Sequence, residues 1–135
     1  MKKIYIAGKI GGLPFDDVVK KFATAQTELE AKGYKVINPV EQLIQYNNLL
    51  RISGGVPLTE ESNRSEILKM DIQLLTGCNS IYMLKDWHIS DGATMEYHIA
   101  YTLGMEIMFD SDQTHSVLIS VTELHKNDRF SPQID

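Results

Sequence analysis

The chain has 135 residues, a formal net charge of −5 at pH 7 and 43% hydrophobic residues, which fits one domain, residues 1–135, with a sizeable core. Its Lys and Arg residues are scattered and the apolar stretch before Lys9 is too short for a signal peptide, so we expect neither a nucleic-acid nor a membrane partner. Cys78 is the only cysteine, which excludes an internal disulfide and fits a small buried thiol in a cytoplasmic protein.

The first part of the chain predicts a β-α-β unit. An apolar run over 4–7 leads into a glycine-rich loop at 8–14. From Asp16, the expected N-cap, apolar residues recur at helical spacing until Gly33. Residues 34–38 then predict a second strand.

The rest of the chain predicts three more helices and two or three more strands. A short helix is expected at 41–50, and the loop at 53–57 is expected to be mobile and to lie over a site. A further helix starts at Thr59 and ends at Gly77. The remaining expected elements are strands at 79–84 and 105–109, a helix between them that ends at Gly104, a fifth strand at 117–121, and a loosely ordered tail from about residue 122.

This alternation predicts the α/β class: a single-domain open parallel sheet of four to five strands with helices on both faces, of the flavodoxin or Rossmann-like kind. Such sheets bind ligands at the carboxyl ends of their strands. Three connections, 8–14, 39–42 and 85–92, are expected to emerge at that edge. Their polar residues are therefore expected to converge on one cleft.

The most informative segment runs from Ser90 to Tyr101, because Gly92 marks a turn that opens a helix and Glu96 follows in its first or second turn. Unpaired N–H groups at a helix start favour an anionic group, and glycine lets a ligand approach the backbone. Glu96 is therefore a candidate site residue. The alternative is that Glu96 only complements the helix dipole.

Several common kinds of site lack support in this sequence. The four histidines show no metal-ligand spacing, no dinucleotide or triphosphate loop motif is present, and no Ser or Cys lies in a nucleophile elbow. We expect no metal and no other cofactor. Carboxylates with a tyrosine can instead act on a sugar carbon, one carboxylate as nucleophile and an acid protonating the leaving group. Tyr5, Asp71, Asp86 and Glu96 are candidates for this chemistry; the alternative is an ordinary strand tyrosine with solvated aspartates.

Three segments together resemble the nucleoside 2-deoxyribosyltransferase superfamily, over roughly residues 3–109. They are Lys3-Ile4-Tyr5-Ile6-Ala7-Gly8, Asp71 before an apolar strand, and Gly92-Ala93-Thr94-Met95-Glu96 followed by Ala100 and Gly104. The superfamily includes transferases that exchange bases between deoxynucleosides and hydrolases of deoxynucleoside 5'-monophosphates. It also includes many small phage and bacterial members, which this chain resembles most.

The resemblance implies a catalytic role for three residues. Glu96 matches the nucleophile that attacks the anomeric carbon and forms a covalent deoxyribosyl intermediate, and Tyr5 matches the tyrosine that orients it. Asp71 matches the acid that protonates the departing base, for which burial would have to raise its pKa. The alternative for Asp71 is a cap or a surface ion pair.

The resemblance also implies a substrate-binding set of Gly8, Lys9, Ser90, Asp91 and Gly92. Ser90 stands where the transferases have a sugar-binding aspartate and the monophosphate hydrolases have a phosphate-binding serine; here the aspartate is Asp91. The loop from Gly8 resembles the hydrolases' phosphate loop but is one residue shorter and lacks its arginine. Lys9 either supplies that charge or is a solvated loop residue.

The expected partner is thus a small nucleoside or nucleotide, and family members imply a homo-oligomer, a dimer or larger. Asn38 falls where family members place a residue over the base, while Trp87 and His88 either stack on a base or cover the sheet edge. A non-catalytic nucleotide-binding or sensing domain of the same fold is the alternative function, and a partner-binding module is a third.

Overall fold

Four parallel strands form one sheet in the order β2-β1-β3-β4 in the computed structural model, which describes residues 1–110. The strands are β1 (Lys3–Ala7), β2 (Lys35–Ile37), β3 (Ser80–Met83) and β4 (Glu106–Phe109). The predicted open α/β fold with a parallel sheet is therefore confirmed. The fifth strand predicted at 117–121 and the tail predicted from about residue 122 lie outside the described residues.

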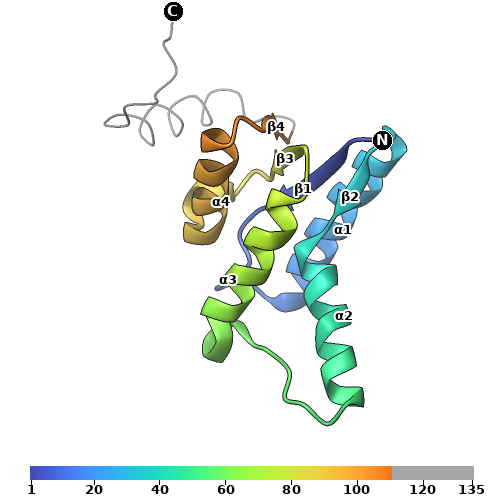
Figure 1. Ribbon diagram of the computed structural model, residues 1–135, viewed down its shortest axis with the longest axis vertical. Coiled ribbons are helices and arrows are strands. Elements are labelled where there is room, and N and C mark those ends of the chain that lie inside the picture. The colour runs from blue at the N-terminus through green and yellow to red at the C-terminus, as the bar shows by residue number, and fades with distance from the viewer. Residues whose placement is uncertain (111–135) are drawn as a thin grey trace, which may run out of the picture.

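Helices cover both faces of this sheet (Figure 1), as predicted. Because side chains alternate along a strand, Ile4 and Ile6 of β1 pack with α1 while Tyr5 and Ala7 pack on the opposite face. The helices are α1 (Phe15–Ala31), α2 (Pro39–Ile52), α3 (Glu60–Thr76) and α4 (Asp91–Thr102), with one 3₁₀ turn at Trp87–Ile89. Within residues 1–110, no helix is both long and apolar enough to span a membrane.

The connections that follow the neighbouring strands β1 and β3 run to opposite edges of the sheet. From β1 the chain passes through α1 to β2 on one side, whereas from β3 it passes through α4 to β4 on the other. The two strand ends remain paired, since the Leu84 N–H donates to the Ala7 carbonyl at 2.8 Å. Connections that diverge from adjacent strands leave a crevice at their carboxyl ends, where this class of sheet binds its ligands.

Two helix starts differ from the sequence prediction. Asp16 is not the N-cap of α1, because Pro14 occupies that position and Asp16 lies in the first turn, where its charge suits the helix dipole. Helix α2 starts at Pro39 rather than Glu41, because the Asn38 side chain accepts hydrogen bonds from the N–H groups of Val40 and Glu41. The expected connection at 39–42 is therefore part of a helix.

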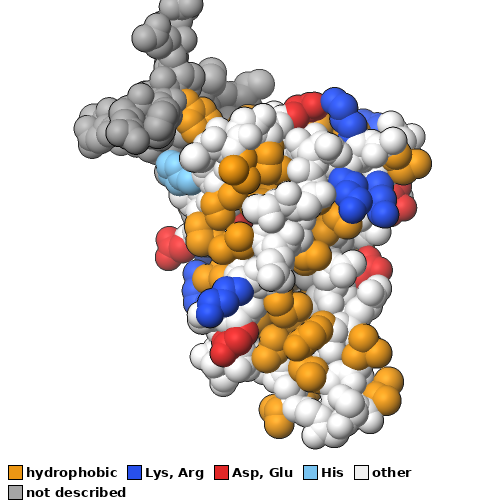
Figure 2. Space-filling model, in the orientation of Figure 1, with side chains coloured by type: hydrophobic (Ala, Val, Ile, Leu, Met, Phe, Trp, Pro, Cys, Tyr) orange, Lys and Arg blue, Asp and Glu red, His pale blue; other side chains and the backbone are white. Residues whose placement is uncertain are grey.

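Helices α2 and α3 extend together beyond the sheet and are joined by a loop at their far end (Figure 1). Hydrophobic side chains gather on this end of the visible surface (Figure 2). Four of the exposed large hydrophobic residues, Tyr46, Leu49, Ile52 and Val56, belong to α2 and this loop. The expected homo-oligomer stays a prediction, and this surface offers apolar area that a second copy would bury.

The start of the glycine-rich loop provides a test of the packing. A Cβ atom added at Gly8 would lie 2.6 Å from Cδ1 and 3.0 Å from Cβ of the buried Leu84, whereas one at Gly11 would meet no atom within 4 Å. We expect Gly8→Ala to lower the free energy of unfolding by about 1–3 kcal/mol, because Leu84 must move within a packed core. Urea denaturation measures this, with Gly11→Ala as the control. Equal stability of the two variants would contradict this packing.

Candidate functional site

Glu96 lies in the second turn of α4 and is only 5% exposed. It belongs to the buried side of the helix with Ala93, Tyr97 and Ala100, at positions where apolar residues would ordinarily pack. The hydroxyl of Tyr5, from the middle of β1, donates a hydrogen bond to its Oε2 atom. A dipole-complementing role at the surface does not account for this burial. The hydrogen bond joins Tyr5 to Glu96, the two residues that the resemblance paired.

Asp71 lies on the buried side of α3 between Ile67 and Leu75, and it is 8% exposed. Burial raises its pKa to about 7, and the charge of Glu60 adds to this rise. The alternative of a surface cap or ion pair is wrong, because the carboxyl group is buried and no ion pair of Asp71 forms within residues 1–110.

Burial, the Tyr5 hydrogen bond and the charge of Asp71 all affect the ionisation of Glu96. Burial raises the pKa of Glu96 to about 8; the Tyr5 hydrogen bond lowers it, and the charge of Asp71 raises it. Burial and the Glu96 charge raise the pKa of the Tyr5 hydroxyl well above its usual range, so Tyr5 stays a donor. The Tyr5 hydrogen bond favours negative charge on Glu96, yet burial leaves the pKa of Glu96, about 8, above the pKa of Asp71, about 7, so that near neutral pH and without a substrate the proton lies mainly on Glu96.

Two cavities meet at Asp71. The larger has a volume of about 300 Å³ and lies between the glycine-rich loop, α2 and the start of α3. The smaller has a volume of about 40 Å³ and is bordered by Gly8, Ser90, Gly92 and Glu96. Asp71, Glu60, Ile10 and Gly11 border both cavities. The site is thus a wide, mainly apolar chamber beside a narrow polar one, with Asp71 between them.

Ser90 and Gly92 lie where the sequence analysis expected them, at the start of α4. Ser90 is the N-cap, and its Oγ accepts a hydrogen bond from the Ala93 N–H at 3.2 Å, which leaves its own hydroxyl hydrogen able to donate. A Cβ added at Gly92 would meet Leu68 at an ordinary distance of 3.6 Å. Packing alone therefore does not require glycine at this position.

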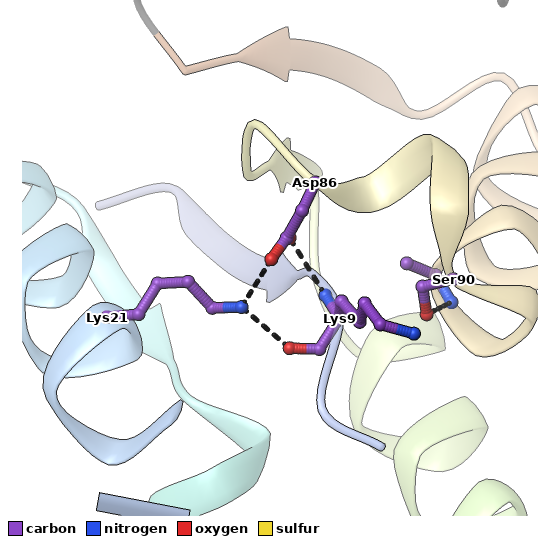
Figure 3. Close-up of polar contacts among 5 residues, drawn as sticks. Lys9, Lys21, Asp86 and Ser90 are labelled. Carbon is purple, nitrogen blue, oxygen red and sulfur yellow. Dashed lines mark hydrogen bonds and ion pairs between the residues drawn. The ribbon is translucent and has the colours of Figure 1, made fainter. Parts of the chain in front are cut away.

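Asp86 does not face Glu96, contrary to expectation. Its Oδ1 accepts from the Lys9 N–H at 3.0 Å, and Lys21 Nζ donates both to its Oδ2 and to the Lys9 carbonyl (Figure 3). Asp86 therefore holds the backbone of the glycine-rich loop against α1. The Lys9 side chain points toward Ser90, away from Asp86, and borders neither cavity.

Four other expected positions lie away from the two cavities. Asp91 is exposed at the first position of α4, and Asn38 is used to cap α2 and to bind Gln26. Trp87 is fully buried and stacks on Tyr97 with ring centroids 4.9 Å apart, so it does not stack on a base. Loop residues 53–57 border neither cavity, although Leu58 and Thr59 border the larger one.

Cys78, expected to be buried, is only half-buried.

Sequence reasoning missed Glu60 and Arg64. Both border the small cavity from α3, and Glu60 borders the large one as well. They precede Asp71 at positions compatible with one helical face, a spacing that was visible in the sequence. The Arg64 guanidinium is exposed and makes no hydrogen bond or ion pair with the described residues. Arg64 therefore places a positive charge at the border of the small cavity, which Lys9 does not border.

No group of three or more His, Cys, Asp or Glu side chains suited to a metal ion occurs in the part of the chain that the structure describes. The reactive groups that the described residues bring together are the carboxyl groups of Asp71 and Glu96, the Tyr5 hydroxyl and the start of α4.

The hydrogen bond from Tyr5 predicts a measurable ionisation change. We expect Tyr5→Phe to raise the pKa of Glu96 by about one pH unit, because the lost donor stabilises the charged carboxylate. Carbon-13 NMR titration of the Glu96 carboxyl group measures this. Tyr82→Phe is the matched control, since its hydroxyl binds Asp110 instead. A lower or unchanged pKa of Glu96 in Tyr5→Phe would show that the bond does not stabilise the carboxylate.

The sequence matches the model of a protein family described as "Domain of unknown function (DUF4406)" over residues 2–109. No curated protein and no solved structure matches the chain. The matched residues include all four strands of the described sheet, together with Tyr5, Asp71 and Glu96. The chain therefore belongs to the DUF4406 family.

Proposed function

We propose that this protein cleaves or transfers the N-glycosidic bond of a 2'-deoxynucleoside or its 5'-monophosphate. The observation that carries the proposal is a buried glutamate, Glu96, that accepts a hydrogen bond from Tyr5 and lies beside a second buried carboxyl group, Asp71. The resemblance of the same three residues to the nucleoside 2-deoxyribosyltransferase superfamily supports it. Structural ion pairs do not explain this arrangement, because both groups are acids.

The reaction proceeds in two steps on these groups. A carboxylate oxygen of Glu96 attacks the anomeric carbon, so that the carbon–oxygen bond forms while the carbon–nitrogen bond to the base breaks. The step requires an ionised Glu96 and a protonated Asp71, so substrate binding has to move the proton from Glu96 to Asp71, which then donates it to the departing base. Water or a second base then attacks the same carbon, Glu96 leaves as a carboxylate, and Asp71 takes up the proton that the acceptor releases.

The two cavities suit the two parts of such a substrate. The larger, of about 300 Å³ and mainly apolar, accepts the planar base, and Asp71 at its border reaches the base during departure. The smaller, of about 40 Å³, has room for water but not for a sugar ring, so the sugar enters only when side chains at its edge move. Arg64 is exposed and Leu68 is only partly buried, so these two are the residues expected to move.

Incubation with single substrates tests the function. The purified protein is mixed with each deoxynucleoside and each 5'-monophosphate, with and without a free acceptor base, and base release and exchange are followed by chromatography. We expect turnover by the natural chain and a loss of at least about 1000-fold in Glu96→Gln, because the nucleophile is removed. The exposed Glu66, which borders neither cavity, provides the control Glu66→Gln.

Each result has a distinct meaning. Base release alone identifies a hydrolase, and exchange identifies a transferase. Mass spectrometry of the protein mixed with substrate is expected to detect a deoxyribosyl group on the natural chain and none on Glu96→Gln. Absence of turnover with every substrate, together with equal ligand binding by the natural chain and Glu96→Gln, would overturn the proposal in favour of a nucleotide-binding domain.

Arg64 predicts a preference for the phosphorylated substrate. We expect Arg64→Gln to lower kcat/KM for a 5'-monophosphate by about tenfold or more while changing that for the nucleoside little, because a charge-assisted hydrogen bond to phosphate is lost. Arg51→Gln, an exposed arginine at the end of α2, is the control. Equal losses for the two substrates in Arg64→Gln would show that Arg64 does not contact the phosphate.

A further inference from the structure

We infer that the large cavity selects bases that carry an exocyclic amino group, and that the Glu60 carboxylate recognises that group. The inference rests on the proposed function and names its substrate class: cytosine or adenine nucleotides in preference to uracil, thymine or hypoxanthine ones. Three features of the described residues carry it: the position of Glu60, the chemistry of the cavity wall, and the effect of the Asp71 charge on Glu96.

Local hydrogen bonds hold Glu60 in place. The Asn47 side chain pairs with both backbone groups of Leu58, donating to the carbonyl at 2.9 Å and accepting from the N–H at 2.8 Å. Thr59 caps α3, and the helix is interrupted at Asn63 (φ −131°, ψ 32°), whose side chain accepts from the Thr59 N–H. The first turn of α3 is thereby tied to α2, across the large cavity, and Glu60 borders both chambers.

The polar side chains around the large cavity are mainly hydrogen-bond acceptors. Its wall is largely apolar; the Asn47 amide donates and accepts in its contacts with Leu58, and Thr59 Oγ1 accepts from the Ser62 N–H and keeps its hydroxyl hydrogen. The remaining polar side chains that border it are Glu60, Glu61 and Asp71. No Lys or Arg is among the described residues that border this cavity. A base in the chamber therefore meets carboxyl oxygens.

This chemistry distinguishes bases that otherwise have the same shape. An ionised carboxylate accepts hydrogen bonds and donates none, so it pairs with an amino group and repels a carbonyl oxygen at the same position. Burial raises the pKa of Glu60, while the neighbouring Arg64 charge lowers it and the Glu61 charge raises it. A carbonyl opposite Glu60 would leave two acceptors facing each other in a partly desolvated place, which costs binding energy.

Glu60 and Asp71 have different tasks in this scheme. Asp71 and Glu96 both border the small cavity. The charge of Asp71 raises the pKa of Glu96, and the charges of both groups raise the pKa of Tyr5. Glu60, like Asp71, borders both cavities, whereas Glu96 borders only the small one of these two. Because the charge of Asp71 acts on Glu96, we assign protonation of the departing base to Asp71 and recognition of the base to Glu60, at the first position of α3.

Two matched substrate pairs test the inference. Deoxycytidine and deoxyuridine 5'-monophosphates differ in an amino against a carbonyl substituent and in the hydrogen that the neighbouring ring nitrogen carries only in the carbonyl partner, as do the deoxyadenosine and deoxyinosine monophosphates. For the ring class that the enzyme accepts, we expect kcat/KM of the natural chain to favour the amino partner by about 10- to 100-fold. In Glu60→Gln, whose amide can also donate, the ratio is expected to fall to within about threefold of one. Glu66→Gln, on the exposed side of the same helix, is expected to keep the ratio of the natural chain.

A binding measurement separates failure of this inference from failure of the proposed function. The same four nucleotides are titrated calorimetrically into Glu96→Gln and into the double variant Glu60→Gln/Glu96→Gln, so that no turnover occurs. An amino preference in the first variant that is lost in the second supports the inference whether or not the natural chain has activity. Equal binding of both members of each pair to Glu96→Gln, or an amino preference that persists without Glu60, overturns it even if the natural chain is an active enzyme.

Discussion

A carboxyl group that is 5% exposed needs a hydrogen-bond partner, and for Glu96 that partner is the hydroxyl of Tyr5. The bond joins the middle of β1 to the second turn of α4, two elements far apart in the sequence. It forms only because the pairing of Tyr5 with Ile81 turns the tyrosine toward the α4 side of the sheet. A shift of β1 by one residue would turn Tyr5 toward α1 and leave Glu96 without its donor.

The site as a whole places polar groups where the fold would otherwise bury apolar ones. Asp71 and Glu96 interrupt the buried sides of α3 and α4, and burial raises the pKa of both carboxyl groups. Two neighbouring acids stabilise a fold poorly, because desolvation penalises their charged forms and their charges repel. Their cost is offset by the packed sheet around them. Buried acids with raised pKa values are common at functional sites, which supports the proposed function.

The sequence predicted the described sheet, most helix positions, and the proximity of Tyr5 to Glu96, because apolar periodicity and glycine positions are local signals that strand pairing then brings together. It did not predict which polar residues serve the scaffold. Asn38 and Asp86 have the same residue types as ligand-binding groups, but one caps a helix and the other binds loop backbone, and only three-dimensional contacts distinguish these uses. Glu60 was missed because the interruption of α3 and the contact of Asn47 with Leu58 determine its position.

Helices α2 and α3 and the loop that joins them extend beyond the sheet (Figure 1). Much of the wall of the large cavity comes from these two helices and their loop, whereas Tyr5 and Glu96 come from β1 and α4. Under the proposed function, the part of the site that contacts the base is therefore largely separate in the chain from Tyr5 and Glu96. Exchange of residues 40–66 between family members is then expected to change the base preference while Tyr5, Asp71 and Glu96 stay in place. Such an arrangement allows related chains to diverge in substrate choice by changing one contiguous stretch of sequence.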